Sequence, residues 1–151
     1  YKSNTQFSFV ESFEKSNVFD EFAKTEHPFD SIRGQYHGKL SLLNAEEKKC
    51  LSTKTITVKA GVQAYLEFDY CSDDPGSVFF VSSYYAGQSN DVDVWIQMTA
   101  SSANWKRVYI PIADDIGKRG TIPFNLMFTL IKKDGQATAS VNIDNIKIIH
   151  F

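Results

Sequence analysis

The stretch that decides the fold is Ser140-Val-Asn-Ile-Asp-Asn-Ile-Lys-Ile-Ile149, near the end of the chain. Its β-branched residues alternate as in a strand, but those before Asp144 follow one phase and those after Asn145 follow the other. A strand that changes face between these two residues contains a β-bulge. The later phase, extrapolated backwards, turns Asp144 towards the core, where a carboxylate must be hydrogen-bonded, ion-paired or bound to a metal. The alternative is a solvated Asp-Asn kink.

Length and composition predict a single all-β domain covering residues 1–151. A chain of 151 residues can bury about two-thirds of its unfolded surface around one core. The 12 Phe and 7 Tyr, together with abundant Thr, Ser and Val, favour strands. With a net charge of −2 and no Lys/Arg stripe, nucleic acid is not an expected partner.

The sequence also limits how the chain relates to membranes. No apolar run approaches the roughly 20 residues that a transmembrane segment needs. No signal peptide is present, but a start at Tyr1 is compatible with removal of a targeting segment, including one that carried a lipid anchor.

The two cysteines leave alternatives open. If the chain turns back at Ala60-Gly61, Cys50 and Cys71 face each other across a hairpin and can form a disulfide. Two free buried thiols fit the sequence equally well, and a crossing between sheets at this turn would separate the residues. No Cys-x-x-Cys or Cys/His cluster indicates zinc.

Short segments of alternating polarity, separated by turn signals, fill the rest of the chain. Asp73-Asp-Pro-Gly76 breaks the chain, and Asp134-Gly135 is a strong hairpin turn. About nine or ten strands with no long helix predict a two-sheet antiparallel β-sandwich of jelly-roll type. The expected strands are residues 7–13, 39–43, 53–58, 62–71, 78–85, 91–99, 105–112, 121–132 and 140–149.

The order of several weak motifs resembles that of galactose-binding-like jelly rolls. The relatives we name are cleaved-adhesin domains and carbohydrate-binding modules common in secreted and surface proteins of Bacteroidetes-type bacteria. The resemblance covers nearly the whole chain and rests on the motifs' order and spacing. The motifs are Phe9-Val-Glu-Ser-Phe13, Gly34-Gln-Tyr-His-Gly-Lys-Leu-Ser-Leu42, Val58-Lys-Ala-Gly-Val-Gln-Ala-Tyr-Leu-Glu-Phe-Asp-Tyr70, Asn104-Trp-Lys-Arg-Val-Tyr-Ile-Pro-Ile112, Phe124-Asn-Leu-Met-Phe128 and Asn142-Ile-Asp-Asn-Ile-Lys-Ile148.

This resemblance implies a structural calcium ion. In those families the ion joins the first strand to the last, using acids like Glu11 and Asp144 and carbonyls of the loop near Gly34 to Leu40, although an additional Asp or Asn is missing from that loop here. Glu11 also lies in the apolar phase of its strand, and calcium needs six to eight oxygen ligands. Buried hydrogen bonding or an ion pair with Lys or Arg is the alternative for both acids.

A sugar site is expected around Trp95. Strict alternation of residues 91–99 buries the even positions and sends Trp95 to the opposite face, beside Asp93 and Gln97. An exposed indole flanked by planar polar groups suits pyranose rings, and Tyr84, Tyr85 and Tyr36 are candidate neighbours. The alternative is that Trp95 packs under a loop. The resemblance implies that Trp105, which starts a strand at a position that closes the end of the sandwich in those families, belongs to the core.

Catalysis is not expected. Glu67-Phe-Asp69 matches the opening of the Glu-x-Asp-x-x-Glu signature of jelly-roll glycoside hydrolases, but Ser72 stands at the last acid position. We therefore expect a non-catalytic carbohydrate-binding or adhesin-like module of a secreted or cell-surface bacterial protein, whose partner is a glycan or a host or cell-surface protein. The alternative is a structural or protein-interaction sandwich without a sugar site.

Overall fold

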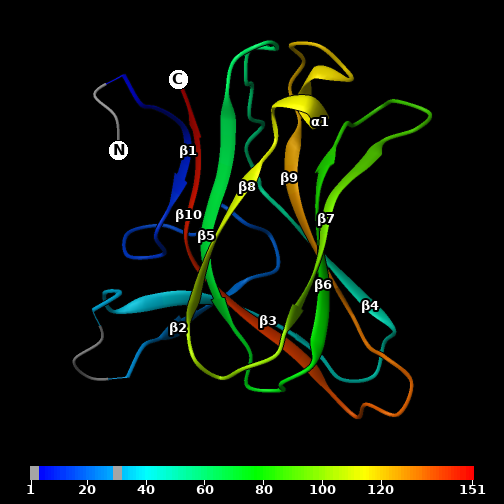
Figure 1. The fold of residues 1–151 in the computed structure, drawn as a ribbon. Coiled ribbons are helices and arrows are strands. Elements are labelled where there is room, and N and C mark those ends of the chain that lie inside the picture. The colour runs from blue at the N-terminus through cyan, green and yellow to red at the C-terminus, as the bar shows by residue number, and fades with distance from the viewer. Residues whose placement is uncertain (1–3, 29–31) are drawn as a thin grey trace.

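The computed structural model describes residues 4–28 and 32–151, which form two antiparallel sheets (Figure 1). The six-stranded sheet has the order β2-β3-β10-β5-β8, with β1 also paired to β10, and the four-stranded sheet has the order β4-β9-β6-β7. The predicted jelly-roll sandwich is confirmed. The elements are β1 (Gln6–Glu11), β2 (Ala23–Glu26), β3 (Tyr36–Leu42), β4 (Glu47–Leu51), β5 (Ala64–Cys71), β6 (Ser77–Tyr84), β7 (Val92–Ala100), β8 (Lys106–Pro111), α1 (Ala113–Gly117), β9 (Asn125–Ile131) and β10 (Ala139–His150).

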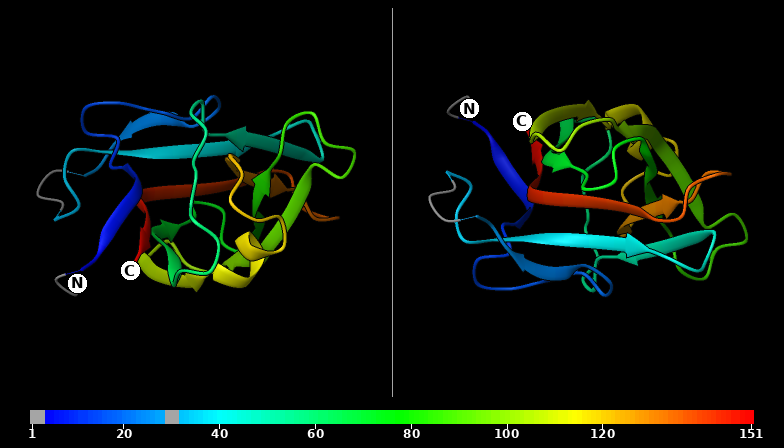
Figure 2. Two further views of the ribbon diagram at one scale, coloured as in Figure 1. Left: turned by 90° about the horizontal axis from the view of Figure 1, so that it is seen from above. Right: turned by 90° about the horizontal axis from the view of Figure 1, so that it is seen from below.

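Strand β10 is the centre of the six-stranded sheet and lies between β3 and β5 in both end-on views (Figure 2). Its first half, from Ala139 to Ile143, pairs with β3, and its second half, from Ile146 to His150, pairs with β1. On its other edge the register with β5 shifts between Asp144 and Lys147, and Asn145 has a positive φ of 50°. The bulge predicted from the phase change is therefore present.

The direction predicted for Asp144 is wrong. Asp144 is fully buried, but it shares the phase of Asn142, opposite to the core residues Val141 and Ile143, and its partner is a histidine on the outer face of the sheet. Since the bulge inserts a residue at Asn145, the phase that follows it cannot be extrapolated backwards.

The core lies between the two sheets and is rich in phenylalanine. Phe68 of β5 packs at a ring-centroid distance of 5.6 Å from Phe128 of β9 and 6.3 Å from Phe79 of β6. Edge-to-face aromatic packing of this kind adds to the free energy of simple burial. The Phe-rich alternating segments that predicted strands thus also hold the two layers together.

Gly38 of β3 makes room for an aromatic side chain from the segment after β1. A Cβ atom added at Gly38 would lie 2.6 Å from the ring of Phe13, which is fully buried and has a positive φ of 61°. Phe13 also contacts the rings of Phe19 and Phe22. Only glycine lets this aromatic cluster approach β3 so closely.

The cysteines lie in different sheets, so the hairpin that would have paired them does not exist. Cys50 lies in β4 of the four-stranded sheet and Cys71 in β5 of the six-stranded sheet, and both are free and buried. Burial raises the pKa of Cys50 to about 12 and raises that of Cys71 as well. The segment 53–58, predicted as a strand, makes a single bridge from Ile56 to Phe124, whereas the charged stretch before Cys50 belongs to β4.

Candidate functional site

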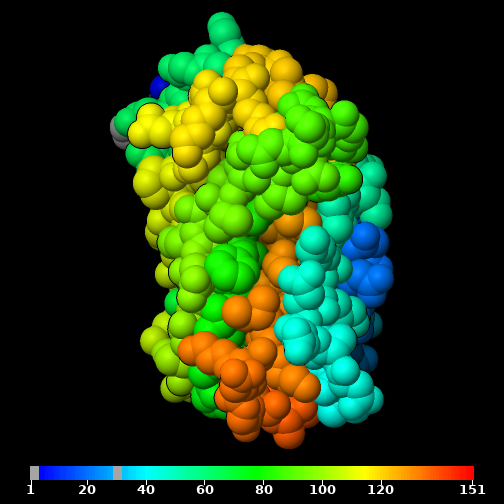
Figure 3. Space-filling model, turned by 90° about the vertical axis from the view of Figure 1, so that its right-hand side faces the viewer, coloured from blue at the N-terminus to red at the C-terminus, as the bar shows by residue number. Residues whose placement is uncertain are grey.

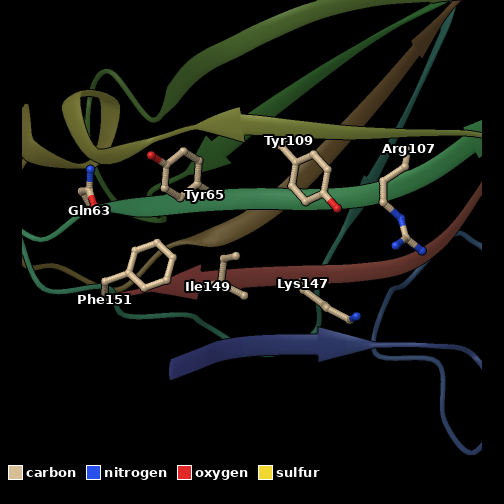
Figure 4. A pocket seen from close by; sticks show the side chains of 7 residues that line it. All are labelled: Gln63, Tyr65, Arg107, Tyr109, Lys147, Ile149 and Phe151. Atoms are coloured by element: carbon tan, nitrogen blue, oxygen red, sulfur yellow. The ribbon is translucent and has the colours of Figure 1, made fainter. Parts of the chain in front are cut away.

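An open groove of about 600 Å³ runs over the outer face of the six-stranded sheet, on the side away from the four-stranded sheet (Figure 4). Strands β5, β8 and β10 supply most of its wall. The residues that line it are Gln63, Tyr65, Arg107, Tyr109, Lys147, Ile149 and Phe151. We refer to this feature below as the groove.

Strand alternation places these residues together. The residues of β5 that point away from the core are Tyr65, Glu67 and Asp69, since Leu66 and Phe68 face inward. Tyr65 is in register with Ile149 of β10, and Glu67 is in register with Tyr109 of β8 and Lys147 of β10. The groove is therefore apolar at the Tyr65 level and polar one step further along the strands.

The aromatic side chains of the groove are partly open to solvent. Tyr109 is 56% exposed, and the rings of Tyr65 and Phe151 pack edge to face at 6.1 Å. Each ring is carried by or next to a strand of the sheet, so the aromatic surface is held in place by the sheet hydrogen bonds.

Arg107 borders the polar end of the groove and is fixed by Asp69. Its Nε and Nη2 donate to the two carboxylate oxygens at 2.8 and 3.2 Å, and Asn145 Nδ2 donates to the same carboxylate at 3.0 Å. Burial favours a higher pKa for Asp69, but the hydrogen bonds from Arg107 and Asn145 outweigh it and lower the pKa. The hydrogen bonds to Asp69 raise the pKa of Arg107, so the pair stays ionised.

Two buried histidines lie beside this pair on the same face. His27 Nε2 is 2.7 Å from Asp144 Oδ2, and the rings of His27 and His37 are 4.6 Å apart. Trp105 packs 5.3 Å from each histidine ring. The prediction that Trp105 belongs to the core is therefore wrong, because its indole covers the histidines on the outer face.

Hydrogen-bond donors offset the cost of burying the carboxylates of Asp144 and Glu11. Asp144 is held by His27 and by the backbone N–H of Asn145 at 2.8 Å. Glu11, 2% exposed, accepts from the backbone N–H groups of Val18 at 2.6 Å and Phe13 at 3.1 Å. Glu11 therefore ties the segment after β1 to the end of that strand.

These contacts do not fit a calcium ion shared by Glu11 and Asp144. A cation needs oxygen ligands, whereas the immediate partners of both carboxylates are N–H groups and, for Glu11, the Ser16 hydroxyl. No cluster of three or more His, Cys, Asp or Glu side chains suited to a metal occurs among residues 4–28 and 32–151. We therefore do not expect calcium between Glu11 and Asp144, and the melting experiment below tests the ion that the resemblance implies.

None of the six side chains predicted to bind a sugar is among those that line the groove. They belong mainly to β6, β7 and the loop between them, on the four-stranded sheet, whose surface Figure 3 shows with β4 in cyan and β7 in yellow-green at its sides. These residues are Trp95, Asp93, Gln97, Tyr84, Tyr85 and Tyr36.

The predicted exposure of Trp95 is wrong. The β6–β7 register pairs Val81 with Ile96 but Ser82 with Val94, so Trp95 is the additional residue of a bulge. The indole packs on the core at 5.6 Å from the Phe124 ring, and Val94 is left 54% exposed instead. Strict alternation of polarity did not reveal this bulge, because valine tolerates either face.

Three of the other predicted side chains, those of Asp93, Tyr85 and Tyr36, have partners within the protein. Arg119 binds the Asp93 carboxylate at 2.6 and 2.9 Å and lies 4.2 Å from the centre of the buried Tyr85 ring. Lys24 lies 4.3 Å from the centre of the Tyr36 ring. Gln97 is exposed on β7, and Tyr84 is half-buried at the end of β6.

Comparison with known proteins supports the fold. No family model matches the sequence, and no curated protein does. The K3 cleaved adhesin domain of Lys-gingipain from Porphyromonas gingivalis is 12% identical, with a TM-score of 0.68 over 97% of this chain and 99% of that one. The CBM22-2 xylan-binding domain from Paenibacillus barcinonensis is 13% identical, with a TM-score of 0.65 over 95% and 99%.

A third solved structure shares the same architecture. The family 11 carbohydrate-binding module from Clostridium thermocellum is 14% identical, with a TM-score of 0.62 over 99% of this chain and 97% of that one. At such low identity the likeness shows the fold alone. The chain thus has the jelly-roll architecture of cleaved-adhesin domains and carbohydrate-binding modules, as the resemblance of its motifs predicted.

Trp95→Ala should lower the free energy of unfolding by about 3 kcal/mol, because it removes a large side chain that packs on the core. The neighbouring change Val94→Ala, at an exposed position of the same strand, should change it by no more than about 0.5 kcal/mol. Urea unfolding of both variants measures the difference. Equal effects would show that the indole does not support the core.

Glu11→Gln should lower the free energy of unfolding by about 1.5–3 kcal/mol, because it removes the charge that accepts the backbone N–H groups of Val18 and Phe13. Urea unfolding measures this loss.

Thermal melting with added calcium and with excess chelator should give the same midpoint in the unsubstituted protein. A lower midpoint in chelator, for protein shown to contain calcium, would instead establish a stabilising ion.

His37 should make the protein less stable in acid. Burial, followed by the neighbouring His27, lowers the pKa of His37, against the opposing effects of Asn142 and Asp73. The folded state then binds its proton less readily than the unfolded state, whose pKa is about 6.5. The stability that depends on a neutral His37 is fully present above that pH. As the pH falls below it, the free energy of unfolding decreases by at most about 1.4 kcal/mol per pH unit.

The measurement is urea unfolding at pH 7.5 and pH 5.5 for the unsubstituted protein and for His37→Gln. Burial raises the pKa of Asp144, which acts in the opposite direction, so the comparison between the two proteins isolates the histidine. If the unsubstituted protein and His37→Gln lose the same stability between pH 7.5 and pH 5.5, His37 is not the cause of the acid sensitivity.

Proposed function

We propose that this chain is a non-catalytic glycan-binding module whose ligand lies in the groove over β5, β8 and β10. The proposal rests on a row of partly exposed aromatic side chains held by the sheet. Beside them lie side chains with planar polar groups, a guanidinium and an amide. Tyr65, Tyr109 and Phe151 offer apolar faces, and Arg107 and Gln63 offer donors and an acceptor. Pyranose rings combine apolar faces with hydroxyl rims and need both kinds of contact.

The solved structures of similar fold support the same reading. One is described as xylan-binding, and a family 11 module from Clostridium thermocellum, 13% identical with a TM-score of 0.59, was solved with a β-1,3-1,4-mixed-linked tetrasaccharide. We propose a place in a secreted or cell-surface protein on the same basis. No helix among the described residues is long and apolar enough to cross a bilayer.

The acids near the groove support binding without hydrolysis. Glycoside hydrolysis needs two carboxyl groups that reach the substrate from opposite sides of the bond. Glu67 and Asp69 are 1% and 0% exposed and lie on one strand, and both contact Arg107. They build the floor of this face and do not project into the groove.

A protein-interaction module is the second candidate. The K1 and K3 cleaved adhesin domains, which share the fold, favour it. In that case the exposed aromatic side chains of the groove would contact a protein on a host or cell surface. The experiment below separates the two.

Tyr109→Ala and Tyr65→Ala should each reduce affinity for the glycan that the domain retains on an array by at least about tenfold, because aromatic anchors dominate such interfaces. Calorimetric titration of that glycan measures the loss. Val94→Ala, an equally exposed position on the four-stranded sheet, is the control and should bind as the unsubstituted protein does.

Two results would contradict the proposal. Unchanged affinity in both tyrosine variants would place the ligand elsewhere on the surface. Absence of retention on the array, combined with loss of cell adhesion in Tyr109→Ala, would favour the protein-interaction module.

A further inference from the structure

The cationic and anionic side chains around the groove occupy different depths. Arg107 and Lys147 line the groove, and none of the seven residues that line it is an acid. The Arg107 side chain is 46% exposed. In Figure 4, Arg107 and Lys147 lie towards the same end of the groove, and Tyr109 lies level with Lys147. If only the exposed charges acted on a ligand, this end of the groove would attract a carboxylate or sulfate group.

Glu67 lies directly beneath that end. Its Cα is in register with Tyr109 on one side and with Lys147 on the other, and both of these residues line the groove. Its carboxylate Oε1 lies 3.7 Å from Arg107 Nη1, and the residue is 1% exposed. Glu67 is therefore a buried acid between the two cations of the groove.

Asp69 is a second buried carboxylate, one step further along β5. Its carboxylate holds Arg107 through two hydrogen bonds and also lies 3.5 Å from Arg33 Nε. The two cations of the groove are thus faced from below by two carboxylates. Because buried charges are screened less than exposed ones, these carboxylates act on a ligand in the groove although they do not touch it.

Resting on the glycan-binding function proposed above, we propose that Glu67 determines the specificity of the groove and makes it select uncharged glycans over glycans that carry uronic acid or sulfate groups. An uncharged sugar uses Arg107 and Lys147 as hydrogen-bond donors and meets no opposing charge. An anionic group placed between these cations comes close to the Glu67 carboxylate. Like charges brought together in this way reduce affinity, so discrimination comes from a repulsive element.

The test compares glycans that share a backbone and differ in charge. Suitable pairs are xylohexaose with its glucuronic acid-substituted form, and methyl-esterified with unesterified hexagalacturonate. The unsubstituted protein should prefer the uncharged member of the pair that it binds. Glu67→Gln keeps the size of the side chain and removes its charge, so the ratio of anionic to uncharged affinity should rise at least about tenfold and should fall again at high salt.

Two further variants serve as a control for net charge and as a substitute if Glu67→Gln does not fold. Glu47→Gln, on β4 of the other sheet, changes the net charge equally and should leave the ratio unchanged. If Glu67→Gln fails to fold, as a melting curve would show, Glu67→Met removes the same charge without burying an amide at this 1% exposed position and should raise the ratio in the same direction.

The outcomes distinguish this inference from the function on which it rests. Binding of an uncharged glycan with an unchanged ratio in Glu67→Gln, or in Glu67→Met where that variant is needed, overturns the role of Glu67 and leaves the glycan-binding function standing. A preference of the unsubstituted protein for the anionic member overturns it as well. Failure to bind any member of either pair, or any other glycan on the array, overturns both.

Discussion

The hydrogen bonding of β10 is the constraint on which the rest of the sandwich depends. This strand is paired along both edges, with β5 on one side and with β3 and then β1 on the other. The bulge at Asn145 lies where β1 replaces β3 as the partner, and it changes the twist and register of β10 at that point. Asp144, before the bulge, keeps the outward phase of Asn142, and the bulge brings Asn145 to the Asp69 carboxylate. Fold and candidate site therefore originate in one irregularity.

The sequence was sufficient to predict the architecture because the core positions repeat with period two in nearly every strand. The bulge of β10 was predictable because isoleucines stand on both sides of it in opposite phases. The bulge of β7 was not, since valine, tryptophan and isoleucine follow one another there and no phase is clearly broken. The strand β4 was missed as well, because an edge strand of charged residues has the composition of a turn.

The candidate site was harder to predict, because the strands that form it are distant from one another in the sequence. Tyr65, Glu67 and Asp69 stand in the phase of β5 that faces away from the core, and the sequence provided that signal. What it could not provide is the neighbour on each side, since β8 and β10 are distant in the sequence and only the sheet order brings them together. Trp95 is a tryptophan among polar residues of one strand, a pattern that indicates a sugar site, whereas the exposed aromatic surface consists of tyrosines and a phenylalanine from three separate segments.

The separation of the two cysteines has a consequence for how this sandwich is held together. No disulfide joins the sheets, and both thiols are buried with raised pKa values, so they react slowly with oxidants and alkylating agents. Formation of the native state then requires neither an oxidant nor a disulfide isomerase. Such a sandwich keeps the same set of covalent bonds in a reducing and in an oxidising compartment. An engineered surface cysteine would therefore be the one reactive thiol of the molecule.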